Sequence, residues 1–264
     1  MTTSRRRAWM VGGLVAWALV LGLLAVRSHR TDPPTVREQR DLAAAVAVVN
    51  EAMGRTVGLA GQYTVPVIMP IAIEKGCRIT PFRDGATATG IVRVFTEDGG
   101  SRSFLERFAY SLPRSYQAVL SADGNSVRAD AGEFVAVRAK LIVPGEVQVT
   151  ATSGCRPDAD EVDNVLPDSP RSEEPAAVLR QLGASQIEQG SIAFAQCPFG
   201  NPATTAGALG HGVAEPLAAA RKIGGSGEIL DGKQAYVYRR GETEGVVVLP
   251  RADGEAQVYV SQLC

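Results

Sequence analysis

The stretch G-E-V-Q-V-T-A-T-S-G-C, Gly145 to Cys155, returns without a gap as G-E-A-Q-V-Y-V-S-Q-L-C, Gly254 to Cys264. Both copies end on a cysteine. Earlier in each half, I-A-I-E-K-G-C (71–77) resembles I-A-F-A-Q-C (192–197) at the cost of one gap. Similarity at matched positions in two halves indicates that one α+β unit occurs twice in tandem. The alternative is a chance likeness between valine-rich strands.

A helix is predicted at the start of the first half. Thr35 and Glu38 have the spacing of a capping box, and Gly54 is a plausible stop. Four apolar residues recur at intervals of three or four and form one stripe: Leu42, Val46, Val49 and Met53. We expect this stripe to face the core, although a stalk or a dimer seam close to a membrane is an alternative.

An antiparallel hairpin is predicted where the first copy of the repeat lies. Residues 134–143 alternate between apolar and polar side chains, and so do residues 147–151. Pro144-Gly145 supplies the turn between them, which gives a hairpin with one wet face. The same patterns predict a strand at 91–96, a short helix from Ser103 to Pro113 and a helix at 175–182.

Composition divides the chain after the first repeat. Residues 158–174 are acidic, rich in proline and free of aromatic side chains, as is typical of a linker. The roughly 230 residues beyond the N-terminal segment exceed the usual single-domain size of about 100–150 residues. We therefore expect two small α+β domains with mainly antiparallel sheets, at 35–157 and 175–264.

The N-terminal segment 8–26 contains no charged residue and no proline. As a helix it would span about 28 Å, close to the roughly 30 Å of a bilayer core. A signal-peptide apolar region is usually about 7–15 residues long and ends in a small-x-small cleavage pattern, which is missing here. We expect a single-pass anchor at 8–26, a cytoplasmic tail at 1–7 and a juxtamembrane spacer at 27–34. A cleaved signal peptide and a buried core helix are the alternatives.

The four cysteines allow three disulfide pairings, and their spacing alone does not choose among them. If each half holds one cysteine on an entering strand and one after its closing strand, the pairs are Cys77–Cys155 and Cys197–Cys264. Zinc is the rival interpretation, but the chain has no C-x-x-C motif and only two histidines. Disulfides place the bulk of the chain outside the cytoplasm.

Arginine directly follows a cysteine twice, at Arg78 and Arg156. With both cysteines in disulfides, we expect these arginines to be surface neighbours of the bridges rather than a binding pair. No metal and no cofactor is expected. The acidic cluster at 158–163 lacks the glycine and the oxygen ligand that an EF-hand loop needs at its sixth and fifth positions.

Signals for catalysis are few. A hydrolytic dyad or triad would have to use His211, with Ser191 or Ser226 as the nucleophile, yet no nucleophile-elbow motif supports either serine. Glycines on both sides of His211 predict a flexible loop. Residues 227–233 have the spacing of a phosphate-binding loop but lack its Ser or Thr, and Asp231-Gly232 is typical of a hairpin turn.

The charge balance also bears on function. The formal net charge is −1 at pH 7, so no basic stripe favours nucleic acid. We expect a membrane-anchored extracytoplasmic module without enzymatic activity, which binds an unidentified envelope protein or cell-wall component. The alternative is an envelope hydrolase that uses His211 or a pair of carboxylates.

Overall fold

The computed structural model describes the backbone of residues 3–31, 41–157 and 173–264. The chain divides into two units, Met1–Gln39 and Arg40–Cys264. Three predicted features lie wholly or mostly outside the described residues. These are the capping box at Thr35–Glu38, the end of the spacer, and the acidic linker with its carboxylate cluster.

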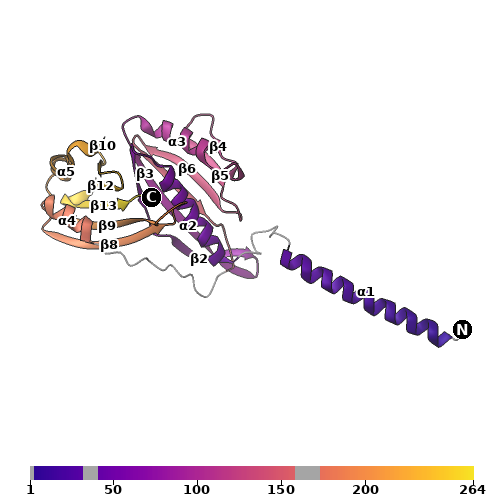
Figure 1. The fold of residues 1–264 in the computed structure, drawn as a ribbon. Coiled ribbons are helices and arrows are strands. Elements are labelled where there is room, and N and C mark those ends of the chain that lie inside the picture. Colours follow the sequence, from indigo (N-terminus) through magenta and orange to yellow (C-terminus); the bar gives the residue numbers. More distant parts are fainter. Residues whose placement is uncertain (1–2, 32–40, 158–172) are drawn as a thin grey trace. The chain divides into compact units, whose positions relative to one another are not determined.

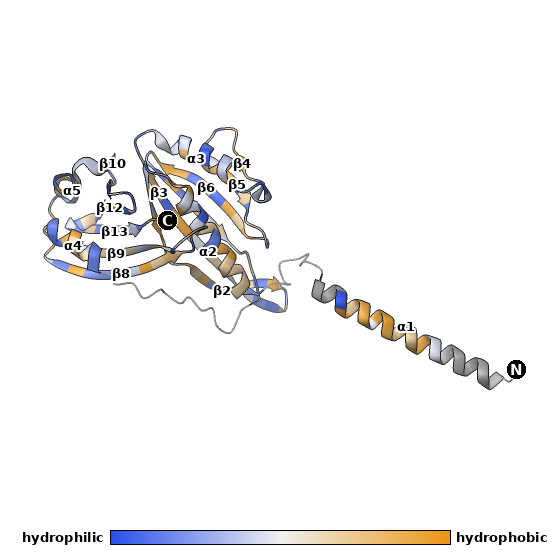
Figure 2. Cartoon of the chain, in the orientation of Figure 1, coloured by the Kyte–Doolittle hydropathy of each residue, from blue (hydrophilic) through white to orange (hydrophobic). Residues whose placement is uncertain are grey.

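The N-terminal unit contains one helix, α1 (Thr3–Thr31) (Figure 1). Its side chains from residue 12 to residue 27 are exposed, and apolar residues predominate along this stretch (Figure 2). Within the described residues, Gly12–Arg27 is a shorter apolar helix, and α2 (Leu42–Leu59) is long and apolar enough to cross a membrane. Half of that α2 stretch is buried, so α2 is a core helix. Anchoring through residues 8–26 stays a prediction.

α2 begins where Asp41 caps it. The Asp41 carboxylate accepts a hydrogen bond from the Ala44 N–H over 2.8 Å, which satisfies one free donor of the first turn. The predicted apolar stripe is confirmed, because all four of its members are buried. The predicted stop at Gly54 is wrong. The helix continues past Gly54, where the missing side chain lets it approach another segment of backbone.

Sheet 1 is a seven-stranded antiparallel sheet in the first half. Its strands are β1 (Thr64–Ile68), β2 (Ala72–Thr80), β3 (Arg83–Thr96), β4 (Val119–Leu120), β5 (Ser126–Asp130), β6 (Ala136–Val143) and β7 (Glu146–Thr152). The order is β1-β3-β7-β6-β5-β4, with β2 also paired to β3. The hairpin predicted around Pro144-Gly145 is β6–β7.

α3 (Gly100–Ser111) and α2 cover one face of sheet 1. Three aromatic and aliphatic residues of α3 join the core: Phe104, Leu105 and Phe108. The helix begins at Gly100, three residues before the predicted start at Ser103, because Gly99 takes the positive φ of the preceding turn.

Sheet 2 is a six-stranded antiparallel sheet in the second half. Its strands are β8 (Gln186–Ala195), β9 (Ala203–His211), β10 (Glu228–Asp231), β11 (Tyr236–Arg240), β12 (Glu244–Pro250) and β13 (Ala256–Gln262). The order is β8-β9-β13-β12-β11-β10. Two helices cover one face of this sheet, α4 (Glu174–Gln181) and α5 (Pro216–Gly224). The chain is therefore an α+β protein with two antiparallel sheets.

The two sheets pack against each other through β1. All five residues of β1 are buried, and Val65 and Val67 share an apolar cluster with residues of β11, β12 and β13. A Cβ added to Gly245 on β12 would lie 2.4 Å from a methyl group of Val65, so glycine permits the close approach. Residues 40–264 thus form one compact unit, and folding of each half as a separate domain stays a prediction.

One disulfide links two strands, or the residues just after them, in each half. Cys77 on β2 is bonded to Cys155 after β7, with Cα atoms 5.9 Å apart. Cys197 after β8 is bonded to Cys264 after β13, with Cα atoms 5.7 Å apart. These are the pairs that the repeat predicts. Structural disulfides are typical of oxidising compartments, so they indicate an extracytoplasmic location.

The prediction for the two arginines is wrong at Arg156. Arg78 is exposed, as expected, but Arg156 is 0 % exposed. The Arg156 guanidinium donates hydrogen bonds to the carbonyl oxygens of Ser153 and Glu133 and lies over the ring of Phe134. A buried cation needs such acceptors, and Arg156 therefore ties the end of β7 to the turn before β6.

Candidate functional site

A groove follows the C-terminal half of α2 where the two halves meet. We call it the α2 groove and define it by three adjoining cavities that share lining residues. The first, of about 520 Å³, is lined by Val57, Gly58, Ala60, Gly61, Gln62, Arg239, Gly241, Glu242, Leu263 and Cys264. The second, of about 470 Å³, is lined by Arg55, Gly58, Leu59, Ser111, Pro113, Pro198, Phe199 and Cys264. The third, of about 520 Å³, is lined by Ala47, Asn50, Glu51, Arg55, Gln196, Cys197 and Pro198.

The wall opposite α2 is held in place by α2 itself. A Cβ on Gly54 would lie 1.7 Å from the Gln196 carbonyl oxygen, so helix and loop are in backbone contact. One turn earlier, the Asn50 side chain accepts a hydrogen bond from the Gln196 N–H (2.6 Å) and donates one to the Phe194 carbonyl (3.4 Å). The Cys197–Cys264 disulfide fixes the same loop to the end of the chain. The groove is thus preformed by covalent and hydrogen-bonded contacts.

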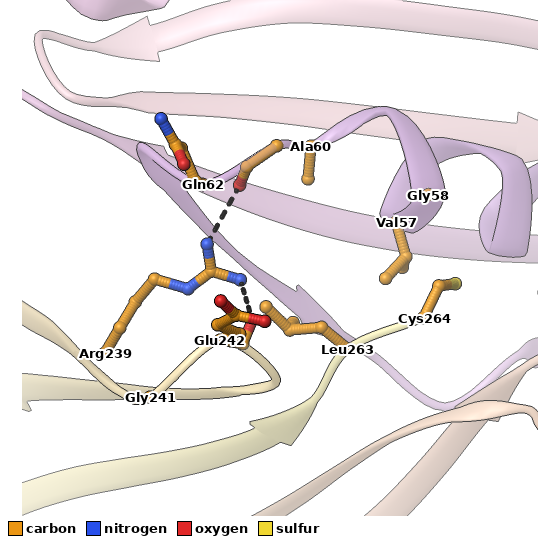
Figure 3. Close-up of a pocket in the computed structure, with 10 residues that line it drawn as sticks. Val57, Gly58, Ala60, Gln62, Arg239, Gly241, Glu242, Leu263 and Cys264 are labelled. Atoms are coloured by element: carbon orange, nitrogen blue, oxygen red, sulfur yellow. Dashed lines mark hydrogen bonds between the residues drawn. The ribbon is translucent and has the colours of Figure 1, made fainter.

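Arg239 of β11 lines the first cavity (Figure 3). Its Nη1 donates to the Gly61 carbonyl (3.3 Å) and its Nη2 to the Glu242 carbonyl (2.8 Å). Its Nε is buried and has no hydrogen-bond partner among the described residues. Burial lowers the pKa of Arg239, and the nearby Glu242 carboxylate opposes that effect.

A guanidinium remains protonated in proteins, so Arg239 brings a positive charge into this cavity. Its hydrogen-bond acceptors are two neutral carbonyl groups, and the carboxylate of Glu242 acts only through its charge. Arginine forms its strongest contacts with carboxylates and phosphates, because the planar guanidinium donates several hydrogen bonds in a fixed fork. The first cavity is therefore suited to an anionic group.

The second cavity is apolar in character. Leu59, Pro113 and Pro198 line it, and Phe199 is 91 % exposed at its edge. Arg55, which also lines it, forms an ion pair with Glu51 on the preceding helical turn (2.7 Å). The hydrogen bond to Glu51 raises the pKa of Arg55, so this cation is already matched by a carboxylate. The second cavity suits an apolar side chain beside the anion site.

His211 lies elsewhere, as the last residue of β9. The prediction of a flexible loop is wrong, because His211 pairs with Gln186 of β8 and its carbonyl oxygen accepts the Ser185 N–H (2.8 Å). The ring lies between two carboxylates: Nε2 is 3.2 Å from Glu188 Oε1, and Nδ1 is 3.0 Å from Glu255 Oε1. Both ring nitrogens therefore have partners.

The two serines considered as nucleophiles are not among these ring partners. Ser191 is an exposed residue of β8, and Ser226 lies in the short 3-10 turn Gly225–Gly227. The segment with phosphate-loop spacing forms the β10–β11 hairpin, in which Gly232 N–H donates to the Ala235 carbonyl. Among the residues with described placement, no group of three or more His, Cys, Asp or Glu side chains could hold a metal ion.

Sequence reasoning missed the α2 groove altogether. Arg239 stands in Y-V-Y-R-R-G, where it reads as one of two strand-end arginines, and Phe199 follows the Cys197-Pro198 turn without any motif. The available signal in the sequence was weak: an aromatic residue two positions after a cysteine. The groove arises only because α2, the β11–β12 turn and the end of the chain converge.

Comparison with known proteins adds little to this description. No protein-family model matches the sequence, and no curated protein matches it. A solved structure of a DUF4853 family protein from Actinomyces odontolyticus is similar to the chain, with 14 % identity and a TM-score of 0.37. The similarity covers 66 % of this chain and 96 % of the other. A likeness at this TM-score does not bear on the site or on function.

Proposed function

We propose that the protein is a single-pass membrane protein whose compact unit lies outside the cytoplasm and binds a polypeptide component of the cell envelope. The α2 groove is its binding site. The ligand segment carries a carboxylate, which Arg239 binds, and an apolar side chain, which enters the second cavity. The proposal thus assigns a binding site and a ligand chemistry to the non-enzymatic module that the sequence predicts.

Two features support anchoring through residues 8–26. The segment is uncharged and long enough to cross a bilayer as a helix. The apolar side chains of α1 from residue 12 to residue 26 are exposed within the N-terminal unit, so water or lipid must surround them. Lipid is the favourable surrounding for such a surface. The disulfides agree with placement of the unit that follows on the oxidising side of the membrane.

The observation that carries the binding proposal is the state of the Arg239 guanidinium. A buried N–H without an acceptor is costly, and a native structure usually satisfies such a group. A ligand carboxylate next to Arg239 would balance its charge. The combined polar and apolar cavities have the size and composition common in ligand sites.

The alternative is the envelope hydrolase that uses His211. The carboxylates of Glu188 and Glu255 beside the ring favour it, because acids at a histidine are common in catalytic sites. The same contacts also argue against it. A general base needs one ring nitrogen directed at the nucleophile, and both nitrogens of His211 already face a glutamate.

The groove can be tested by selecting peptides on the purified full-length chain in detergent micelles. We expect the selected peptides to share an acidic residue or a free C-terminal carboxylate next to an apolar residue. Arg239→Gln removes the charge and should weaken binding roughly 10- to 100-fold, as expected for loss of one charge-assisted contact. Isothermal titration calorimetry measures this change.

Arg128→Gln is the matched control. Arg128 is an exposed arginine of β5 and lines none of the three cavities, so its loss should leave the affinity unchanged. Peptides that bind Arg239→Gln as tightly as the wild type would contradict the proposal. Selection of no peptide motif would also contradict it. His211→Ala should bind peptide normally, and a loss of peptide hydrolysis in that variant would favour the enzyme instead.

The tandem duplication belongs with this proposal, because the two halves have the same strand order. Sheet 1 reads β2-β3-β7-β6-β5-β4, and sheet 2 reads β8-β9-β13-β12-β11-β10. In each half the disulfide joins a cysteine in or just after the edge strand to a cysteine that follows the closing strand. β1 has no counterpart in sheet 2, and it is the strand that packs the halves together. We propose that the two halves arose as two copies of one unit. In this proposal β1 was added to the first copy, where it forms the interface with the second, and the copies then diverged.

A further inference from the structure

The β2–β3 hairpin ends in an unusual tip. Thr80 pairs with Arg83, so Pro81 and Phe82 form a tight turn. The Phe82 side chain is 99 % exposed, and Arg78 and Arg83 beside it are exposed as well. Asp84, which pairs with Arg78 across the hairpin, is the acidic residue nearest the tip. The tip thus carries an exposed aromatic ring between two arginines.

The tip lies near the N-terminal end of α2. α2 runs along β3 in the same direction: Leu42 packs at Ala86 and Ala88, and Met53 packs at Gly90. Beyond the start of α2 the hairpin continues for four more residues, from Ala86 to Phe82, or about 13 Å at the strand rise per residue. The tip therefore projects past the helix end to which the N-terminal unit is joined.

The chain length ties this end to the membrane. Residues 27–40 separate the apolar segment from the cap of α2, and 14 residues span at most about 50 Å. A tether of this length keeps the start of α2, and the hairpin tip near it, within reach of the bilayer. This step rests on the proposed anchoring through residues 8–26.

We propose that the β2–β3 hairpin is a second membrane contact, with Phe82 inserted at the bilayer interface and Arg78 and Arg83 bound to anionic lipid headgroups. An aromatic ring gains from leaving water at this depth, and arginines keep their charged ends in the headgroup layer. Anionic lipids attract such basic residues. The contact fixes the orientation of the compact unit on the membrane and turns the far end toward the envelope.

The experiment uses the full-length chain in vesicles that contain brominated lipids. Replacement of Trp9 and Trp17 by Phe removes both native indoles. Phe82→Trp then places the single fluorophore at the tip. In vesicles with anionic lipid we expect a blue-shifted emission and loss of roughly half of the intensity or more, as for an indole about 5–10 Å deep in the interface. Arg78→Gln with Arg83→Gln should remove the dependence on anionic lipid.

Tyr110→Trp in the same background is the matched control, because Tyr110 is an aromatic residue of α3 that is 92 % exposed. Its indole should stay red-shifted and unquenched. Equal quenching of the two variants overturns the proposal, and so does the absence of quenching at position 82. A blue shift without quenching would indicate a contact with protein and also overturns it. Vesicle flotation reports the anchor separately. Protein that fails to float overturns the anchor and the hairpin contact together, whereas floating protein with an unquenched tip overturns the hairpin contact alone.

Discussion

Gly54 decides how closely α2 can lie against the second half of the chain. A methyl group there would meet the Gln196 carbonyl oxygen at 1.7 Å, far inside contact distance. A glycine after an apolar stripe is also typical of a helix end, which is why the sequence predicted a stop at Gly54. The close approach explains why glycine stands in the middle of a helix despite its low helix propensity.

Gly54→Ala should therefore destabilise the protein. Overpacking of this kind costs about 1–3 kcal/mol, which lowers the melting temperature of a unit of this size by roughly 2–4 °C per kcal/mol. Gly58→Ala is the control on the same helix, because its methyl group would reach Pro198 at an ordinary 3.5 Å. We expect Gly58→Ala to match or exceed the wild-type melting temperature, since alanine favours the helix. Equal melting temperatures for the two variants would contradict the packing of α2.

Arg156 shows what sequence alone conceals at this scale. Two Cys-Arg pairs look equivalent in the sequence, but one arginine is exposed and the other is buried. Arginine is rarely buried completely, so the surface prediction followed the usual behaviour of this residue type. Burial is possible because the carbonyl oxygens of Ser153 and Glu133 converge on the guanidinium, and no local pattern reveals that convergence.

At the scale of elements, the sequence predicts strands well where one face of the strand is exposed to solvent. The β6–β7 hairpin and the β10–β11 hairpin could be read from alternation and turn residues. β1 could not be predicted in this way. Its sequence T-V-P-V-I is buried on both faces, so it lacks the alternation of apolar and polar residues that marks a strand. The repeat predicts the disulfide pairs, since it matches strand ends between the halves. The α2 groove was invisible because its walls come from segments far apart in the chain.

The contacts of β1 and α2 predict that the halves stay associated after the chain is cut between them. β1 shares an apolar cluster with sheet 2, and α2 touches the loop after β8. A specific protease site inserted at Asp163 allows one cleavage between the halves. Both fragments should then coelute on size-exclusion chromatography without denaturant. Elution as two separate smaller species would show that each half is an independent domain, as the sequence alone suggested.

At the scale of the whole molecule, two halves with similar strand orders pack together through β1, and we propose that residues 8–26 tether them to a membrane. In this proposal the β2–β3 hairpin contacts the bilayer. The α2 groove runs along the junction of the halves. Each disulfide closes a loop of similar length, with sequence separations of 78 and 67 residues. Loops of this size can stabilise a fold by up to about 4 kcal/mol in the chain-entropy model.

One measurement tests both the extracytoplasmic location and the equivalence of the two halves. Free thiols are alkylated in intact cells before lysis. The full-length chain is then recovered from the membrane fraction and analysed by a non-reducing peptide map. We predict that the map contains Cys77 linked to Cys155 and Cys197 linked to Cys264, with no alkylated cysteine. Alkylation of all four cysteines would place the compact unit in a reducing compartment. A bridge between Cys155 and Cys197 would join the two halves covalently and contradict the equivalent closure of each half on which the account depends.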